Sequence, residues 1–175
     1  MNTLDTLLVV VLVISAALGL YWGVIRQLLS VAGLIAGILD ITSAFVIAGI
    51  KGTGSIRMLQ GIASGLLGQR SFEGGMATAG LGLGIHFLIA FTAAAVFYAA
   101  SRKFSSLTQH AVVSGFLYGI VVYIFMYWVV MPLAFPSARH SMSRDVTAVI
   151  IHIVLIGLPI ALVVRRFSKE QLAES

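Results

Sequence analysis

ATAGLGLGIHFLIAFTAAAVFYAA, residues 77–100, is the stretch that decides the fold. It holds no Lys, Arg, Asp or Glu. A helix needs about 20 residues to cross the hydrocarbon of a bilayer, and this stretch is longer. After Ser101 come Arg102 and Lys103, at the position where cations reach the lipid headgroups at the end of a span. The stretch therefore predicts a transmembrane helix.

Further apolar stretches of similar length surround this one. They cover about 4–24, 29–50, 111–131 and 146–164. The last of them contains Pro159, which removes a backbone donor and predicts a kink. The sequence thus predicts an all-α fold, a polytopic transmembrane helical bundle with five spans.

Composition agrees with a membrane protein. The chain has 175 residues, of which 59% are hydrophobic and 10% charged, and its mean hydropathy is +1.06. An ordinary soluble domain has about 25% charged residues, so these values exclude a soluble globular protein and a disordered one. The net charge is +5, and many of the Lys and Arg residues lie at the ends of the apolar stretches, which predicts contact with a lipid bilayer. They form no basic stripe with aromatic residues, so we expect no nucleic acid as a partner.

The connection between the second and third stretches carries a pattern of its own. Residues 52–75 are rich in glycine, and their apolar residues have helical spacing from Ile56 to Leu67. This segment is too short to cross a bilayer, and Ser55 can cap its start. We therefore expect a short helix at about 55–68, either amphipathic and lying on the bilayer or re-entrant.

One integral membrane domain, 1–175, is expected. It consists of an extra N-terminal span (1–28), a four-helix core (29–166) and a polar C-terminal tail (167–175). The first span has no Lys or Arg before it and is too long for a signal peptide, so we expect it to be retained. Lys and Arg number six on the side of the C-terminus and five on the other, and the crowding of the six at span ends places the C-terminus in the cytoplasm.

Two parts of the chain are similar to known families. The opening LDTLLVVVLVISAALGLYWGVIRQLLSVAGLIAG, residues 4–37, resembles the colicin V production protein family of bacterial inner-membrane proteins. The segments LDITSAF (39–45), LQGIASGLLG (59–68), FEGG (72–75), LGLGIHFLIAF (81–91) and IHIVLIGLPIAL (151–162) resemble a group of uncharacterised bacterial four-helix membrane proteins. These resemblances imply a multi-pass protein of the bacterial inner membrane and carry over no functional residue.

Three ionisable residues fall inside the predicted spans. A charged side chain costs roughly 2.5–3.5 kcal/mol at the centre of an inserted helix, so Asp40, His86 and His152 each need an explanation. Counted from the span ends, they lie about 9–15 Å below the same membrane surface. Tyr123 falls at a comparable depth, and Thr42 and Ser43 are beside Asp40. The sequence predicts one intramembrane polar cluster of Asp40, His86, His152 and Tyr123.

This cluster has several interpretations. Its members can pin helices together by hydrogen bonds, or Asp40 and a histidine can share a proton on a proton or cation pathway. His86 and His152 are also a pair that could hold haem, and Asp40 could complete a metal site. We therefore keep three functions open: a small transporter or channel-like module, a structural or accessory membrane protein, and a haem- or metal-binding protein.

Catalytic motifs are missing from the sequence. It has no cysteine, nucleophile elbow, phosphate-binding loop or HExxH, and residues 80–84 lack the spacing of a dinucleotide fingerprint. We expect no enzyme and predict no cofactor. Glycine pairs four residues apart, such as Gly33 with Gly37 and Gly115 with Gly119, favour packing inside the bundle over contact with a second copy or a membrane protein partner.

Overall fold

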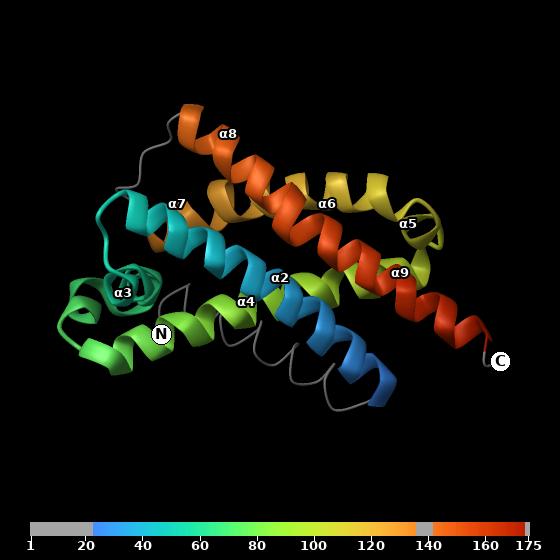
Figure 1. Ribbon diagram of the computed structural model, residues 1–175, viewed down its shortest axis with the longest axis horizontal. Helices are drawn as coiled ribbons and strands as arrows, with labels where there is room; N and C mark the ends of the chain where they lie inside the picture. Colours follow the sequence, from blue (N-terminus) through green and yellow to red (C-terminus); the bar gives the residue numbers. More distant parts are fainter. Residues whose placement is uncertain (1–22, 136–141, 174–175) are drawn as a thin grey trace.

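The computed structural model describes residues 23–135 and 142–173, which form a bundle of long helices (Figure 1). Two unbroken helices, α2 (Gly23–Ile50) and α4 (Gly75–Lys103), pack side by side in opposite directions. A third helical column is α6 (Ala111–Phe125), the π-helical segment η2 (Met126–Val130) and α7 (Met131–Ala134). The fourth is α8 (Met142–Ile151), the π-helical segment η3 (His152–Gly157) and α9 (Leu158–Ala173).

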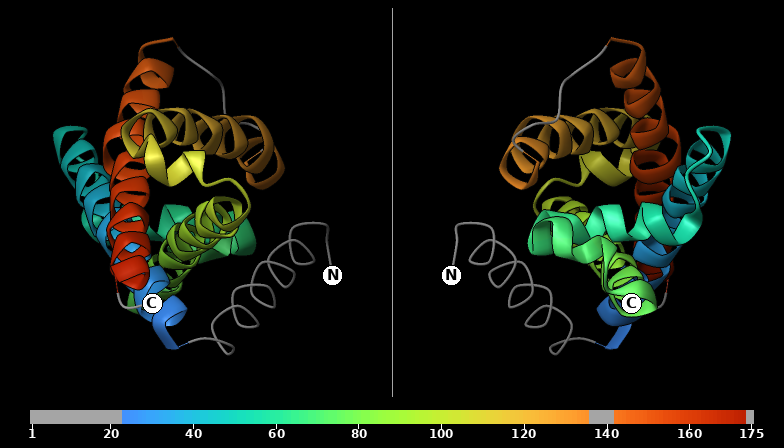
Figure 2. Two further views of the ribbon diagram at one scale, coloured as in Figure 1. Left: turned by 90° about the vertical axis from the view of Figure 1, so that its right-hand side faces the viewer. Right: turned by 90° about the vertical axis from the view of Figure 1, so that its left-hand side faces the viewer.

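Short elements fill the connections. Between α2 and α4 lie α3 (Ser55–Leu67) and the 3₁₀ turn η1 (Gly68–Phe72), and α5 (Ser106–Gln109) joins α4 to α6. The helix expected at about 55–68 is therefore present. Figure 2 shows α3 beside the beginning of α4, and Figure 1 shows that α3 lies at the end of the bundle opposite to α5.

Four helical stretches are long and apolar enough to cross a membrane. They are Leu29–Ile50, Gly75–Lys103, Ala111–Ala134 and Asp145–Ser168. These stretches confirm the predicted spans at about 29–50, 77–100, 111–131 and 146–164. The predicted first span, at about 4–24, lies outside the described residues.

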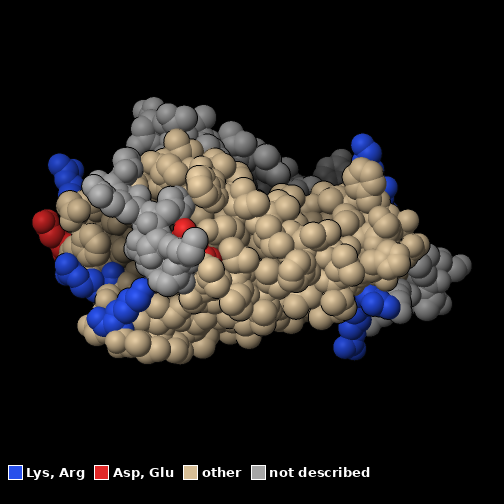
Figure 3. Space-filling model, turned by 90° about the horizontal axis from the view of Figure 1, so that it is seen from above, with Lys and Arg blue, Asp and Glu red and all other residues tan. Residues whose placement is uncertain are grey.

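The outer surface of the bundle suits a bilayer. Large apolar side chains point outward, and Val46, Val112 and Trp128 are 57%, 58% and 62% exposed. On the face seen in Figure 3, Lys and Arg lie at the two ends of the long axis, and the surface between them is uncharged except for a few acidic atoms near one end. The described segments thus form a multi-pass membrane protein whose long axis crosses the hydrocarbon.

Helices meet closely where glycines remove side chains. A Cβ on Gly119 of α6 would lie 2.4 Å from the Cα of Ile153, and a Cβ on Gly157 would lie 2.2 Å from the carbonyl oxygen of Gly115. The backbones of α6 and η3 are therefore in direct contact. Gly33 and Gly37 of α2 likewise leave room for Phe91 and Phe87 of α4, so that both glycine pairs serve packing within the chain.

Both π-helical segments end two residues before a proline. η2 ends at Val130 before Pro132, and η3 ends at Gly157 before Pro159. Proline has no N–H to donate to the preceding turn and its ring crowds that turn, so the backbone widens there. The irregularity expected at Pro159 takes this form. α7 continues η2 directly, so the span runs through Pro132 to Ala134.

A buried hydrogen-bond network fixes α3 against the start of α4. Gln60 of α3 donates to the carbonyl of Gly75 (3.0 Å), while Ser71 donates to the carbonyl of Gln60 (2.5 Å). Thr78 of α4 donates to the carbonyl of Ser71 (2.6 Å). Nearby, Gly82 leaves space for the carbonyl of Leu59, which a Cβ would approach to 2.0 Å. α3 is therefore docked on α4 as part of the bundle.

Candidate functional site

A small cavity inside the bundle brings three of the predicted site residues together. Asp40 of α2, His86 of α4 and His152 of η3 all line this polar cavity, whose volume is about 140 Å³. Nδ1 of His86 lies 3.9 Å from Oδ2 of Asp40. At this distance opposite charges attract each other strongly in a low dielectric, but no direct hydrogen bond forms. Asp40 also interacts electrostatically with His152.

The orientation of His86 follows from its contact with α2. Its Nε2 lies 2.9 Å from the carbonyl oxygen of Gly37. A carbonyl only accepts, so Nε2 carries the hydrogen and donates it. In the uncharged ring, Nδ1 is therefore an acceptor, and this is the nitrogen that faces Asp40. Gly37 permits the contact because it has no Cβ to hold α4 away.

His152 is held in the same way within its own helix. Its Nδ1 lies 2.8 Å from the carbonyl oxygen of Ala148, to which it donates. The uncharged ring is left with Nε2 as an acceptor. His152 is also the first residue of η3, and π-helical turns of this kind are frequent at functional sites.

Tyr123 contacts the ring of His152. Its ring stacks on that of Tyr127, with the centroids 4.8 Å apart, and both rings meet the edge of His152 at 6.0 and 5.9 Å. Tyr123 is absent from the lining of the polar cavity. The structure thus places it as a packing partner of the His152 ring.

The hydroxyl groups beside Asp40 bond to the backbone. Thr42 donates to the carbonyl of Ile38 (2.6 Å), and Ser43 donates to the backbone carbonyl of Asp40 (2.7 Å). Such bonds to the preceding helical turn are an easy alternative for Ser and Thr. These two hydroxyl groups therefore donate to the backbone and not to the Asp40 carboxylate.

The arrangement defines what the polar cavity can hold. With uncharged rings, both imidazole N–H groups are used by backbone carbonyls, and the remaining nitrogens accept. Asp40 adds carboxylate oxygens, which also accept when ionised. The carboxylate and the ring nitrogens of the two histidines thus bring acceptor groups to the cavity lining, and such groups attract a proton or another cation.

Metal or haem binding gains no support from this geometry. Among the residues that the structure describes, no three His, Asp or Glu side chains are grouped to hold a metal ion. The 140 Å³ of the polar cavity is also below the about 300–1,000 Å³ of pockets for drug-sized ligands, and haem needs more room than that cavity has.

Sequence reasoning missed the partners that orient these residues. The carbonyls of Gly37 and Ala148 carry no signal in the sequence, because any residue at those positions supplies one. The buried amide of Gln60 was also missed, although a lone Gln within an apolar face is a detectable exception to the pattern. Its partners, Gly75 and Thr78, depend on the fold.

Comparison of the chain with family models, with curated proteins and with solved structures gives no match. The resemblances of residues 4–37 and of the later segments to bacterial membrane proteins therefore stay predictions.

Proposed function

We propose that the protein is a small transport module that moves protons or a small cation through the bundle by way of the polar cavity. The observation that carries this proposal is the set of acceptors from three helices, Asp40, His86 and His152, around one cavity between membrane spans. An ionisable group is costly inside a membrane and is commonly retained where it serves an ion or proton pathway. The charge pattern and the bacterial resemblances favour the inner membrane, with the C-terminus in the cytoplasm.

Proton flux into proteoliposomes tests this proposal. A pH-sensitive dye inside the vesicles reports proton entry after a membrane potential is imposed. We expect the wild-type protein to acidify the lumen faster than protein-free vesicles, and Asp40→Asn and His86→Gln to slow the flux about 10-fold or more. Glu73→Gln is the matched control, because Glu73 is exposed and lies outside the cavity.

Each variant is first checked for a single gel-filtration peak and a wild-type helical circular dichroism spectrum. Flux that stays at the wild-type level in both folded cavity variants overturns the proposed pathway. A wild-type protein that passes neither protons nor any cation of a broad panel overturns the transport function itself.

One contact favours a second role, as a structural or accessory membrane protein. The hydrogen bond from His86 to the carbonyl of Gly37 joins α4 to α2, which is a helix-pinning function. In that case His86→Gln, which keeps a donor, retains stability, while His86→Leu loses about 1 kcal/mol. This result, combined with an absence of flux, would support the accessory role.

A further inference from the structure

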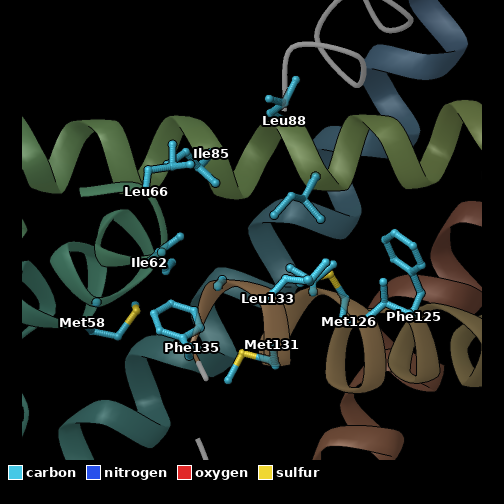
Figure 4. A pocket seen from close by; sticks show the side chains of 16 residues that line it. Met58, Ile62, Leu66, Ile85, Leu88, Phe125, Met126, Met131, Leu133 and Phe135 are labelled. Carbon is cyan, nitrogen blue, oxygen red and sulfur yellow. The ribbon is translucent and has the colours of Figure 1, made fainter. Parts of the chain in front are cut away.

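A second and larger cavity lies next to the polar one. It has a volume of about 430 Å³ and is formed by α3, α4 and the column of α6, η2 and α7. We call it the apolar pocket, since its lining includes Ile62 and Leu66 of α3, Ile85 of α4, and Leu133 and Phe135 beyond η2. Figure 4 shows these side chains around one open space. Its volume lies within the about 300–1,000 Å³ of small-molecule pockets.

The apolar pocket faces the hydrocarbon. Phe125, Val129 and Leu133 line it and are also 48%, 40% and 48% exposed on the surface of the described bundle. No charged residue belongs to the lining. A molecule dissolved in the membrane can therefore enter this pocket from the side without passing through water.

The apolar pocket and the polar cavity share a wall. Ile62 of α3, Ile89 of α4 and Met126 of η2 line both spaces. Met126 is unbranched and adapts its shape easily, so it is the part of this wall that can move aside. One amphiphilic molecule can thus place its apolar part in the apolar pocket and its polar head among Asp40, His86 and His152.

Charge decides which head group fits. The polar cavity offers acceptors, so a carboxylate or phosphate head would face Asp40 without a donor. A protonated amine supplies donors to those same groups, and its charge compensates the partly buried carboxylate of Asp40. The volume of 140 Å³, room for about four or five waters, also restricts the head to a small one.

We propose that the protein binds lipophilic amines, with the apolar part in the apolar pocket and the ammonium group beside Asp40. This inference rests on the proposed function, because it names a substrate class for the same polar cavity. The ammonium group and a proton shared between Asp40 and a histidine then compete for the same acceptor groups. The titratable groups that line the polar cavity are Asp40, His86 and His152, while α3 and the α6–η2 column contribute Ile62, Val122 and Met126.

A matched series of ligands tests the head group. The probes are 4-phenylbutylamine, 4-phenylbutanol and 4-phenylbutyrate, which share one apolar part and carry a cationic, neutral or anionic head at neutral pH. Binding is measured by titration calorimetry on the full chain in nanodiscs, with empty nanodiscs as background. We expect the amine to bind, the alcohol to bind about 10-fold more weakly, and the carboxylate to show no binding above background.

Variants locate the site. Asp40→Asn should weaken binding of the amine by about 30-fold, which corresponds to about 2 kcal/mol, the lower end of the cost of truncating one partner of a buried charge pair, because Asp40 is only partly buried. Ile62→Trp, which fills the shared wall, should weaken binding of the amine and the alcohol alike. Val46→Trp is its control, because Val46 is exposed on α2 and lines neither space.

The outcomes separate this inference from the proposed function. Equal binding of amine and alcohol, or amine binding that survives Asp40→Asn in folded protein, overturns the inference. Proton flux that depends on Asp40 without any amine binding overturns the inference and leaves the proposed function standing. Amine binding that depends on Asp40 and on Ile62, without any flux, supports the site and overturns transport.

Discussion

At the scale of single residues, the contact of Gly157 with α6 gives a sharp test of the packing. A Cβ at Gly157 would lie 2.2 Å from the carbonyl oxygen of Gly115 and 2.5 Å from the amide nitrogen of Gly119. Backbone atoms cannot move aside as a side chain can. We therefore expect Gly157→Ala to lower the free energy of unfolding by about 1–3 kcal/mol, as overpacking does.

The matched control for this substitution is Gly84→Ala. Gly84 is also helical, but no atom lies within 4 Å of the Cβ position. Alanine there should leave stability unchanged or raise it by up to about 1 kcal/mol through helix propensity. Unfolding in mixed micelles, followed by circular dichroism, measures both variants. Equal stability of the two would contradict direct backbone contact between α6 and η3.

The hydroxyl of Tyr118 provides a second test at this scale. It donates to the carbonyl of Ala93 at 2.6 Å and joins α6 to α4, while its ring meets Phe97 edge-on at 5.0 Å. Tyr118→Phe removes the hydrogen bond and keeps the ring. The same unfolding assay should show a loss of about 0.5–1.5 kcal/mol. No measurable loss would mean that the ring contact alone joins the two helices.

At the scale of the element, the docking of α3 can be followed with a thiol reagent, because the chain has no cysteine of its own. Ile62→Cys places a thiol on the face of α3 that lines the two cavities, whereas Arg70→Cys places one on the exposed turn η1. A membrane-impermeant maleimide should label the second variant and spare the first.

Gln60→Leu extends this test. It removes the bonds to Gly75 and Thr78 and keeps the size of the side chain, so it should free α3 and increase labelling of Cys at position 62. Fast labelling of that Cys in the otherwise unchanged chain would show α3 to be an ordinary surface helix. Labelling unaffected by Gln60→Leu would mean that the close contact of Gly82 with Leu59 suffices to dock α3.

The sequence predicts elements better than the contacts between them. Four spans and α3 follow from apolar length and helical spacing, which are local properties. The depth of Asp40, His86 and His152 follows from counting along the spans. The π-helical turns do not follow in this way, since a proline can also produce a simple kink. The two cavities require α3 to dock between α4 and α7, and this depends on the buried bonds of Gln60.

At the scale of the whole molecule, the direction of the helices predicts which loops share a side. η1 and α5 lie at opposite ends of the bundle (Figure 1), and Arg70 and Gln109 are both exposed there. In sealed cells, we expect Cys at position 70 to react with an impermeant reagent from outside, and Cys at position 109 to react after the membrane is opened. The reverse pattern would mean that the protein has the opposite orientation in the membrane. Labelling of both positions from outside would contradict the placement of η1 and α5 at opposite ends of the bundle.

The glycine contact between α6 and η3 also has a consequence for motion. Backbones that touch directly have no side chains between them that could change rotamer, so this contact resists sliding of α6 against η3. α4 meets α6 through side chains, the Tyr118 hydroxyl and the Phe97 ring, and these can slide and repack. A widening of the space around Asp40 and His86 therefore costs less at the side-chain contact of α4 with α6 than at the backbone contact of α6 with η3.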